Sequence, residues 1–255
     1  EQDTKSSSIQ IKPSFTTIPS WKDDVRPLVI ASSSVVLRTI ILQLFLSGAT
    51  AMAARSSSIG GDALAAHQIA IQIWLLCSFI CDSLAAASQT LVADAIGRES
   101  NRDVRTISNL VLFYSILLGL VLSCVGLLIG NDAVISFFLP STTTTTTTTQ
   151  QQLQSILGII LFSQPLNSFV FAADGILQGA SEFPYQAKAM AISASTALFT
   201  YFVVLPTLND TESINISSLQ QVWLALIILQ LVRGITSMIK LIDKDGPINL
   251  LLKEE

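Results

Sequence analysis

Residues 63–93 read ALAAHQIAIQIWLLCSFICDSLAAASQTLVA, and this stretch decides the class of fold. Apart from His67 and Asp82, it contains no Asp, Glu, Lys, Arg or His residue. An α-helix needs about 20 mostly apolar residues to cross the hydrocarbon core of a bilayer. The stretch therefore predicts a membrane-spanning helix that carries a few polar side chains.

Five further apolar runs lie on either side of it, at residues 28–54, 108–130, 153–177, 187–206 and 219–241. Hydrophobic residues make up 50% of the 255-residue chain and charged residues 13%, and the mean hydropathy is +0.60. Soluble domains carry about a quarter charged residues. We predict an all-α integral membrane protein in which residues 28–241 form a bundle of six transmembrane helices. Residues 1–27 form a polar lead-in to this bundle, and residues 242–255 form a tail.

The distribution of basic residues predicts the orientation of the bundle. Eleven of the fourteen Lys and Arg residues lie in the lead-in, in residues 97–105, at Lys188 or from Lys240 onward, whereas the opposite side holds only Arg55. Such an excess marks the cytoplasmic side of a membrane protein. Both termini are therefore predicted on the cytosolic side, or on the equivalent stromal or matrix side. Arg38 and Arg233 are left inside the membrane.

Two N-glycosylation sequons lie in the loop 207–218, on the predicted outer side. They are Asn209-Asp210-Thr211 and Asn215-Ile216-Ser217, and the motif is used only where a loop reaches the secretory lumen. Asn209 and Asn215 are candidate glycosylation sites on that condition, although such sequons are common by chance.

The sequence shows none of the common motifs of an enzyme or of a nucleic-acid-binding protein that we considered. The chain has one histidine and lacks the HExxH, GxSxG and glycine-rich phosphate-loop patterns. Its three cysteines lie inside apolar runs, without the paired CxxC spacing of a zinc site. Its basic residues are scattered rather than clustered, unlike those of nucleic-acid binders. We predict that the chain is not an enzyme and has no metal, organic cofactor or nucleic-acid partner.

Polar side chains follow one face of the helix at 63–93. His67, Gln68, Gln72, Asp82 and Gln89 fall within an arc of about 140° at helical spacing. Asp82 lies about one turn from the middle of the helix, and an ionisable residue at that depth is costly unless it faces a cavity or a partner. Two roles remain open for Asp82. It either couples proton occupancy to a cationic ligand, or it pairs with Arg38 and holds two helices together.

A second polar face lies in the run 153–177. Gln164, Asn167 and Asp174 fall within an arc of about 100°, and Pro165 lies among them. A proline inside a spanning helix frees a backbone carbonyl, which can serve as a polar ligand or a bending point. A simple packing kink at Pro165 and a solvated, helix-end position for Asp174 are the alternatives.

These residues together predict a polar cavity inside the bundle. Its candidate lining is Arg38, Gln43, His67, Gln68, Gln72, Trp74, Gln89, Gln164, Pro165 and Asn167. Arg38 suits a carboxylate ligand and Trp74 an organic cation, so the charge of a ligand stays open. Arg233 lies two turns from Lys240 and is expected to reach toward the cytosolic interface.

Three blocks of sequence resemble the multidrug and toxic compound extrusion (MATE) transporters. The first is LAAHQIAIQIW at 64–74, which continues to DSLAAASQ at 82–89. The second runs from QPLNS at 164–168 through FAADG at 171–175 to GASEFPY at 179–185. The third is Arg38-Thr39. All three are similar to the DinF-like branch found in plants and algae. They occur in the same order and span nearly the whole chain.

The resemblance implies a twelve-helix antiporter built from two six-helix lobes, which works by alternating access and is driven by protons or sodium. This chain resembles the C-terminal lobe, so a missing N-terminal lobe is an expected partner, together with the lipid bilayer, an organic solute and H+ or Na+. Asp82 and Asp174 are the expected coupling residues. A lipid-linked-sugar flippase and a truncated, non-transporting interaction partner are the alternatives, and the sequence does not distinguish a plasma, vacuolar or plastid membrane.

Overall fold

The computed structural model describes residues 20–56, 61–130, 133, 137, 147–210, 216–244 and 246–250. These residues form helices and the turns between them, and no strand occurs among them. The helices are α1 (Arg26–Ser56), α2 (Asp62–Gly97), α3 (Asn101–Ile129), α5 (Thr147–Phe162), α6 (Gln164–Gly179), α7 (Phe183–Phe199), α8 (Leu205–Asp210) and α9 (Ser218–Leu241). Two π-helical turns, η1 (Trp21–Val25) and η2 (Thr200–Val204), precede α1 and follow α7.

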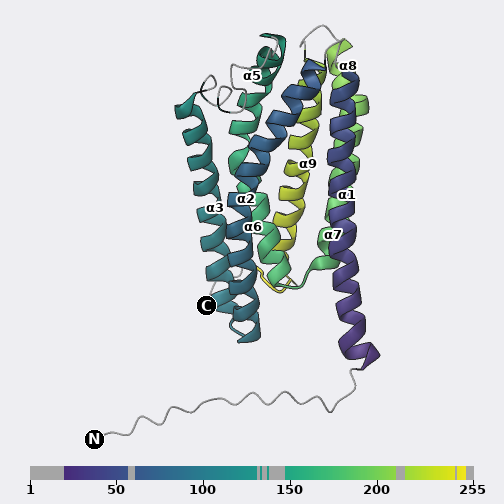
Figure 1. Cartoon of the computed structure of the whole chain (residues 1–255). Helices are drawn as coiled ribbons and strands as arrows, with labels where there is room; N and C mark the ends of the chain where they lie inside the picture. Colours follow the sequence, from purple (N-terminus) through teal and green to yellow (C-terminus); the bar gives the residue numbers. More distant parts are fainter. Residues whose placement is uncertain are drawn as a thin grey trace, which may run out of the picture.

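The helices stand side by side and run up and down, as Figure 1 shows. α1 begins and α9 ends at the lower end of the bundle, so the first and last long helices share one end (Figure 1). Five helical segments are long and apolar enough to cross a membrane, and the pair α5 and α6 makes a sixth if the two are one bent span. The prediction of an all-α membrane bundle is confirmed.

Local sequence signals set several of the helix ends. α9 begins with a capping box, in which the Ser217 side chain accepts the backbone N–H of Gln220 and the Gln220 side chain accepts that of Ser217. The Ser100 hydroxyl likewise accepts the backbone N–H of Asp103 at the start of α3. α2 follows Gly61, whose φ of 72° lies in the left-handed region that glycine adopts without strain. These signals place the chain reversals between the apolar runs.

The predicted span 153–177 is broken in the structure. α5 ends at Phe162 and α6 begins at Gln164, with a bend of 50° between them. Pro165 has no N–H to donate to the carbonyl of Leu161 four residues earlier, and the hydroxyl of Ser123 on α3 donates to that carbonyl at 2.5 Å. The Gln164 side-chain amide donates to the carbonyl of Ile160 at 2.8 Å. Side chains thus satisfy the backbone groups at the break, as a low-polarity surrounding requires.

Glycines allow other helices to lie close to α6. A methyl group at Gly175 or Gly179 would overlap backbone atoms of α2, and one at Gly119 of α3 would overlap the backbone of Gln164 and Pro165. Gly175 and Gly179 form a GxxxG pair, a spacing that lets membrane helices approach closely. α6 therefore packs closely against both α2 and α3.

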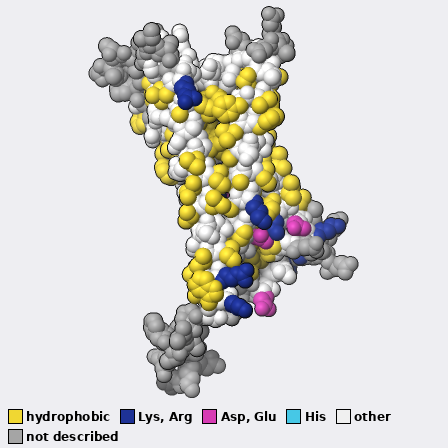
Figure 2. Space-filling view, turned by 90° about the vertical axis from the view of Figure 1, so that its right-hand side faces the viewer, with side chains coloured by type: hydrophobic (Ala, Val, Ile, Leu, Met, Phe, Trp, Pro, Cys, Tyr) yellow, Lys and Arg dark blue, Asp and Glu magenta, His cyan; other side chains and the backbone are white. Residues whose placement is uncertain are grey.

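The outer surface is largely apolar, as expected of a chain that faces lipid. Large hydrophobic side chains such as Leu44, Phe79, Phe113 and Leu128 are more than 60% exposed. Figure 2 shows hydrophobic side chains spread over the middle of one face, while Lys and Arg gather mainly over its lower part. The core itself divides into two clusters: one, which includes Ala66 and Trp223, joins parts of α1, α2, α5, α7 and α9, and the other, which includes Val92 and Ile176, joins α2, α3, α6 and the segment after α9.

The tight contact at the helix break yields a first prediction. Gly119→Ala should destabilise the protein by about 1–3 kcal/mol, because its methyl group meets backbone atoms rather than flexible side chains. The measurement is thermal unfolding of the detergent-solubilised chain. Gly48→Ala is the control, since no atom lies within 4 Å of the added methyl group and alanine favours helix. Equal melting temperatures for the two variants would contradict the prediction.

Candidate functional site

Asp174 of α6 is the centre of a buried charged cluster. Its Oδ2 atom accepts a hydrogen bond from Nη2 of Arg38 on α1 and another from Nη2 of Arg233 on α9. Asp174 and Arg233 are 6% and 5% exposed, and the Arg38 side chain is 20% exposed. A buried ion is stable only when partners compensate the loss of water. The cluster therefore ties three helices together through one carboxylate.

Gln186 of α7 adds a fourth helix to this cluster. Its side-chain amide donates to the backbone carbonyl of Asp174 at 2.8 Å and lies 3.4 Å from Oδ1 of the same residue. Gln186 is itself buried. The carboxylate thus has a donor near each oxygen, which fixes its orientation between the two guanidinium groups.

A chain of hydrogen bonds leads from the charged cluster toward the helix break. Nη1 of Arg233 donates to the side-chain oxygen of Gln230 at 2.5 Å, and the Gln230 amide donates to Asn167 at 2.6 Å. The Asn167 amide in turn lies 3.2 Å from the hydroxyl of Ser78 on α2 and 3.4 Å from the side-chain oxygen of Gln164. All of these side chains are buried. A continuous polar path therefore runs through the middle of the bundle.

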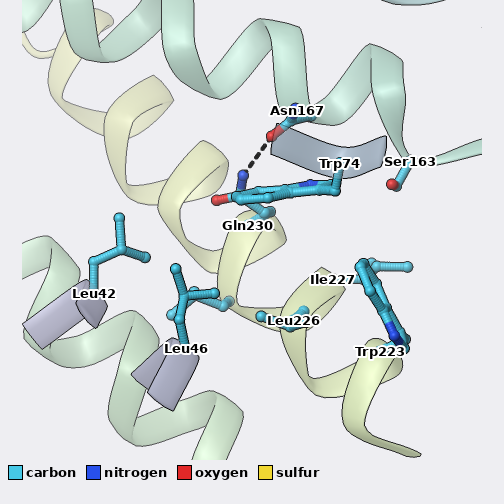
Figure 3. A pocket seen from close by; sticks show the side chains of 10 residues that line it. Leu42, Leu46, Trp74, Ser163, Asn167, Trp223, Leu226, Ile227 and Gln230 are labelled. Atoms are coloured by element: carbon cyan, nitrogen blue, oxygen red, sulfur yellow. Dashed lines mark hydrogen bonds between the residues drawn. The ribbon is translucent and has the colours of Figure 1, made fainter. Parts of the chain in front are cut away.

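A small cavity lies beside the Gln230–Asn167 bond. Figure 3 shows the amide of Gln230 directed at Asn167, with Trp74 and Ser163 also bordering the cavity and Leu42 of α1 among its apolar walls. Its volume is about 20 Å³, enough for about one water molecule. An organic solute does not fit in this cavity in the present conformation.

Two larger pockets lie on the surface of the bundle near predicted site residues. One, of about 240 Å³, is lined by Arg38, Asp82, Gln89, Asp174 and Gln178, with Ala85, Ala86 and Phe171. The second, of about 250 Å³, lies between α1 and α2, where Gln43, Ser47, Thr50 and Trp74 line it with Leu46, Ile71 and Leu75. The first is charged, whereas the second combines hydroxyl and amide groups with an indole ring.

The predicted pair of Arg38 with Asp82 is not the one that forms. Arg38 binds Asp174, and Asp82 is exposed on α2 at the edge of the same pocket. The alternative of a solvated Asp174 is also wrong, because two arginines enclose that carboxylate. Arg233 does not extend to the interface either: its guanidinium turns inward to the buried acid, which compensates its charge where water does not reach.

The predicted polar face of α2 is divided by packing. His67 is completely buried, with Nε2 3.3 Å from the Thr50 hydroxyl and its ring 5.8 Å from that of Trp223. Gln68 and Gln72 are exposed and line none of the pockets described above. Gln89 borders the charged pocket. The spacing on a helical wheel shows which residues share a face of α2. Which of these residues are buried depends on the positions of the neighbouring helices.

Three members of the polar network escaped sequence reasoning: Gln186, Gln230 and the ion-paired role of Arg233. A signal exists for Gln230 and Arg233, since each is a strongly polar residue inside an apolar run, whereas Gln186 lies one residue before the run 187–206. Pro165 lies at the break between α5 and α6 and contacts Gly119 of α3 rather than a cavity for a ligand.

The remaining candidates concern glycosylation and metals. The side-chain amide of Asn209 donates to the carbonyl of Ile216 at 3.0 Å, and Asn215 lies outside the described residues. Both sequons stay predictions. Within the part of the chain that the structure describes, no three His, Cys, Asp or Glu residues are placed to hold a metal ion, and the three cysteines are free thiols.

A bundle of apolar helices with a buried, ion-paired polar centre defines a multi-pass membrane protein. The MatE family model matches residues 27–203, which is 177 of the 255 residues. The chain therefore belongs to the MatE family.

Three curated relatives come from Arabidopsis thaliana. Protein DETOXIFICATION 45, chloroplastic, is 30% identical over 172 residues, which cover 66% of this chain and 29% of the relative. Protein DETOXIFICATION 43 is 29% identical over 224 residues, or 84% and 37% of the two chains. Protein DETOXIFICATION 44, chloroplastic, is 29% identical over 217 residues, or 84% and 38%. The matched region thus spans less than two fifths of each relative.

The shared carboxylate yields a second prediction. Asp174→Ala should lower the melting temperature by roughly 5–10 °C, because it leaves two buried or half-buried arginines without their anion. Asp94→Ala, which removes an exposed carboxylate paired with Arg98 on the same helix, should change it little. Thermal unfolding in detergent measures both.

A double variant tests the cause of that loss. Asp174→Ala combined with Arg233→Met should recover part of the lost stability, because the second change removes the most deeply buried unpaired charge. A double variant whose loss equals or exceeds the sum of the two single losses would show that the ion pair is not the origin of the effect.

Proposed function

We propose that this chain forms one six-helix lobe of a membrane transporter that exports organic solutes by alternating access. The family membership supports transport, and the relatives are named for detoxification. Since the chain spans less than two fifths of their length, a second lobe is part of the proposal. The observation that carries the mechanism is the sharing of the Asp174 carboxylate by Arg38 and Arg233.

Protonation of Asp174 changes the balance of charge in this cluster. With Asp174 ionised, one negative and two positive groups share the centre. A proton on Asp174 removes the anion and leaves two guanidinium groups, on α1 and α9, that repel each other. The state in which Arg38 of α1 and Arg233 of α9 both lie at Asp174 is then less favoured. A ligand or proton that prefers one of two states shifts the equilibrium by its difference in affinity.

Asp82 provides a second partner for Arg38 in this scheme. Both residues line the 240 Å³ pocket, and Asp82 lies on α2, opposite α1. We expect Arg38 to exchange Asp174 for Asp82 when Asp174 takes a proton. The guanidinium would then keep an anion in both states, which lowers the barrier between them because no isolated charge is left in the membrane.

The cluster favours a proton over sodium as the coupling ion. A metal cation in proteins is held by several oxygen ligands, whereas Oδ2 of Asp174 already accepts hydrogen bonds from two arginines and Oδ1 lies 3.4 Å from the Gln186 amide. A proton needs only one oxygen.

The organic solute is assigned to the pocket lined by Gln43, Ser47, Thr50 and Trp74. These side chains offer an aromatic surface and uncharged donors and acceptors, which suit an amphipathic solute. Completion of this pocket by the second lobe is part of the proposal, because its volume of about 250 Å³ is below the usual range of about 300–1,000 Å³ for ligand sites.

A transport assay gives the third prediction. In proteoliposomes that contain the complete transporter, a pH jump should drive solute efflux at least about tenfold more slowly in Asp174→Asn than in wild type, because the variant cannot exchange a proton. Asp82→Asn should slow it as well. Exposed Asp94 on the same helix as Asp82 supplies the control, and Asp94→Asn should transport normally.

Solute exchange without a pH gradient separates loss of coupling from loss of folding, because a folded but uncoupled transporter keeps this activity. Undiminished pH-driven transport in both Asp82→Asn and Asp174→Asn would refute the coupling proposal. Absence of transport by the complete protein under any gradient would instead favour the non-transporting alternative.

A further inference from the structure

A large groove lies at the end of the bundle where α1 begins. Its volume is about 630 Å³, and it lies between the first turns of α1 and the turn that joins α6 to α7. Lys22 and Arg26 border it, and Leu28, Ile30, Phe183 and Pro184 contribute apolar surface. The groove is separate from the charged cluster around Asp174 and from the pocket at Trp74, since it shares no lining residue with either.

The length of α1 places this groove at the depth of the lipid headgroups. Arg26 and Arg55 are 29 residues apart on one helix, which corresponds to roughly 44 Å. A bilayer measures about 40–45 Å with its headgroup layers and about 30 Å without them. The two arginines are therefore far enough apart to reach opposite headgroup layers. Trp21 is 66% exposed one turn before Arg26, as is common for tryptophan at a membrane interface.

The charges at the groove suit an anion. Lys22 and Arg26 are exposed, and neither forms an ion pair with another residue that the structure describes. The neighbouring carboxylate of Glu182 binds Lys240 at 3.1 Å instead. The segment 21–26 also contains Asp23 and Asp24 in its sequence, so the attraction depends on the local position of Lys22 and Arg26 at the groove rather than on net charge.

The apolar part of the groove distinguishes a lipid from a free anion. Leu28 is 66% and Ile30 43% exposed, and both follow Arg26 in the direction of the hydrocarbon core. A phosphate in water would gain little from two exposed cations. A phospholipid instead brings its phosphate to Lys22 and Arg26 and lays its acyl chains on the apolar surface, while the membrane supplies it at high local concentration.

We propose that this groove binds the headgroup of an anionic phospholipid through Lys22 and Arg26, with the acyl chains against Leu28, Ile30 and Phe183. The proposal is independent of the transport mechanism, because it involves none of the coupling or pocket residues. Its consequence is a fixed depth for the start of α1, the helix that also carries Arg38.

Quenching of tryptophan fluorescence by brominated lipids tests the proposal. The full chain is placed in nanodiscs of phosphatidylcholine that contain either brominated phosphatidylglycerol or brominated phosphatidylcholine at equal mole fraction. Phosphatidylglycerol should quench more strongly, and the excess should disappear in Trp21→Phe, because Trp74 and Trp223 lie elsewhere. In Lys22→Gln/Arg26→Gln the preference for phosphatidylglycerol should fall about tenfold or more, and it should weaken with salt.

Matched variants show whether the preference for phosphatidylglycerol comes from Lys22 and Arg26 or from any positive charge on α1. Arg55→Gln removes an exposed arginine from the other end of the same helix and should leave the preference unchanged, whereas Lys22→Arg/Arg26→Lys should retain it. An unchanged preference in the double glutamine variant, or an equal loss in Arg55→Gln, would overturn the proposal. Displacement of the bound lipid by millimolar inorganic phosphate would also overturn it and indicate a site for a free anion.

Discussion

Asp174 carries a negative charge although it is only 6% exposed, and most other features of the polar centre depend on how that charge is compensated. Arg38 and Arg233 reach it from α1 and α9, and Gln186 reaches it from α7. A buried acid without partners would be strongly unfavourable. These helices therefore keep their positions relative to α6 through one carboxylate, and a change in its charge affects all of them together. The apolar packing of α1 adds to this link: Phe45, Ala49 and Ala53 are its buried residues, and partly buried Ile41, Leu42 and Leu46 also pack against the core.

α6 can hold this position because its backbone and its neighbours make room for it. The glycines at 175 and 179 let α2 approach α6 closely, and Gly119 lets α3 approach it at the helix break. The break before Pro165 turns α6 by 50° relative to α5, and Ser123 satisfies the carbonyl that the proline leaves free. Small residues and a bend thus let the neighbouring helices lie close to α6, whereas many large apolar side chains of the other helices are exposed. Close packing replaces the hydrophobic effect as the force between helices in such a surrounding.

The fold was largely predictable, and the site was predictable only in part. The length of an apolar run is set by the thickness of the bilayer. Each predicted run therefore coincides with a helix or a pair of helices in the structure. Asp174, Asn167 and Gln164 were recognised as a polar face and belong to the buried network. Asp82 was given equal weight because it too lies inside a spanning helix, yet it is exposed, whereas Asp174 is enclosed. The pairing of Arg38 with Asp82, one of two roles left open for Asp82, does not form, because helix spacing relates residues within one helix and contains no information on which helices are neighbours.

The sequence by itself determined the class of the protein, the positions of the spanning segments and the residues whose polarity is costly in a membrane. These properties depend on composition and local spacing along one helix. The tertiary structure decided which polar residues meet. Arg38 and Asp174 are 136 residues apart and Arg233 and Asp174 are 59 apart, and only the packing of α1, α6 and α9 brings them together. The same packing covers His67, exposes Gln68 and Gln72, and forms the groove beside the first turns of α1, because burial is a property of neighbouring helices rather than of any one sequence segment.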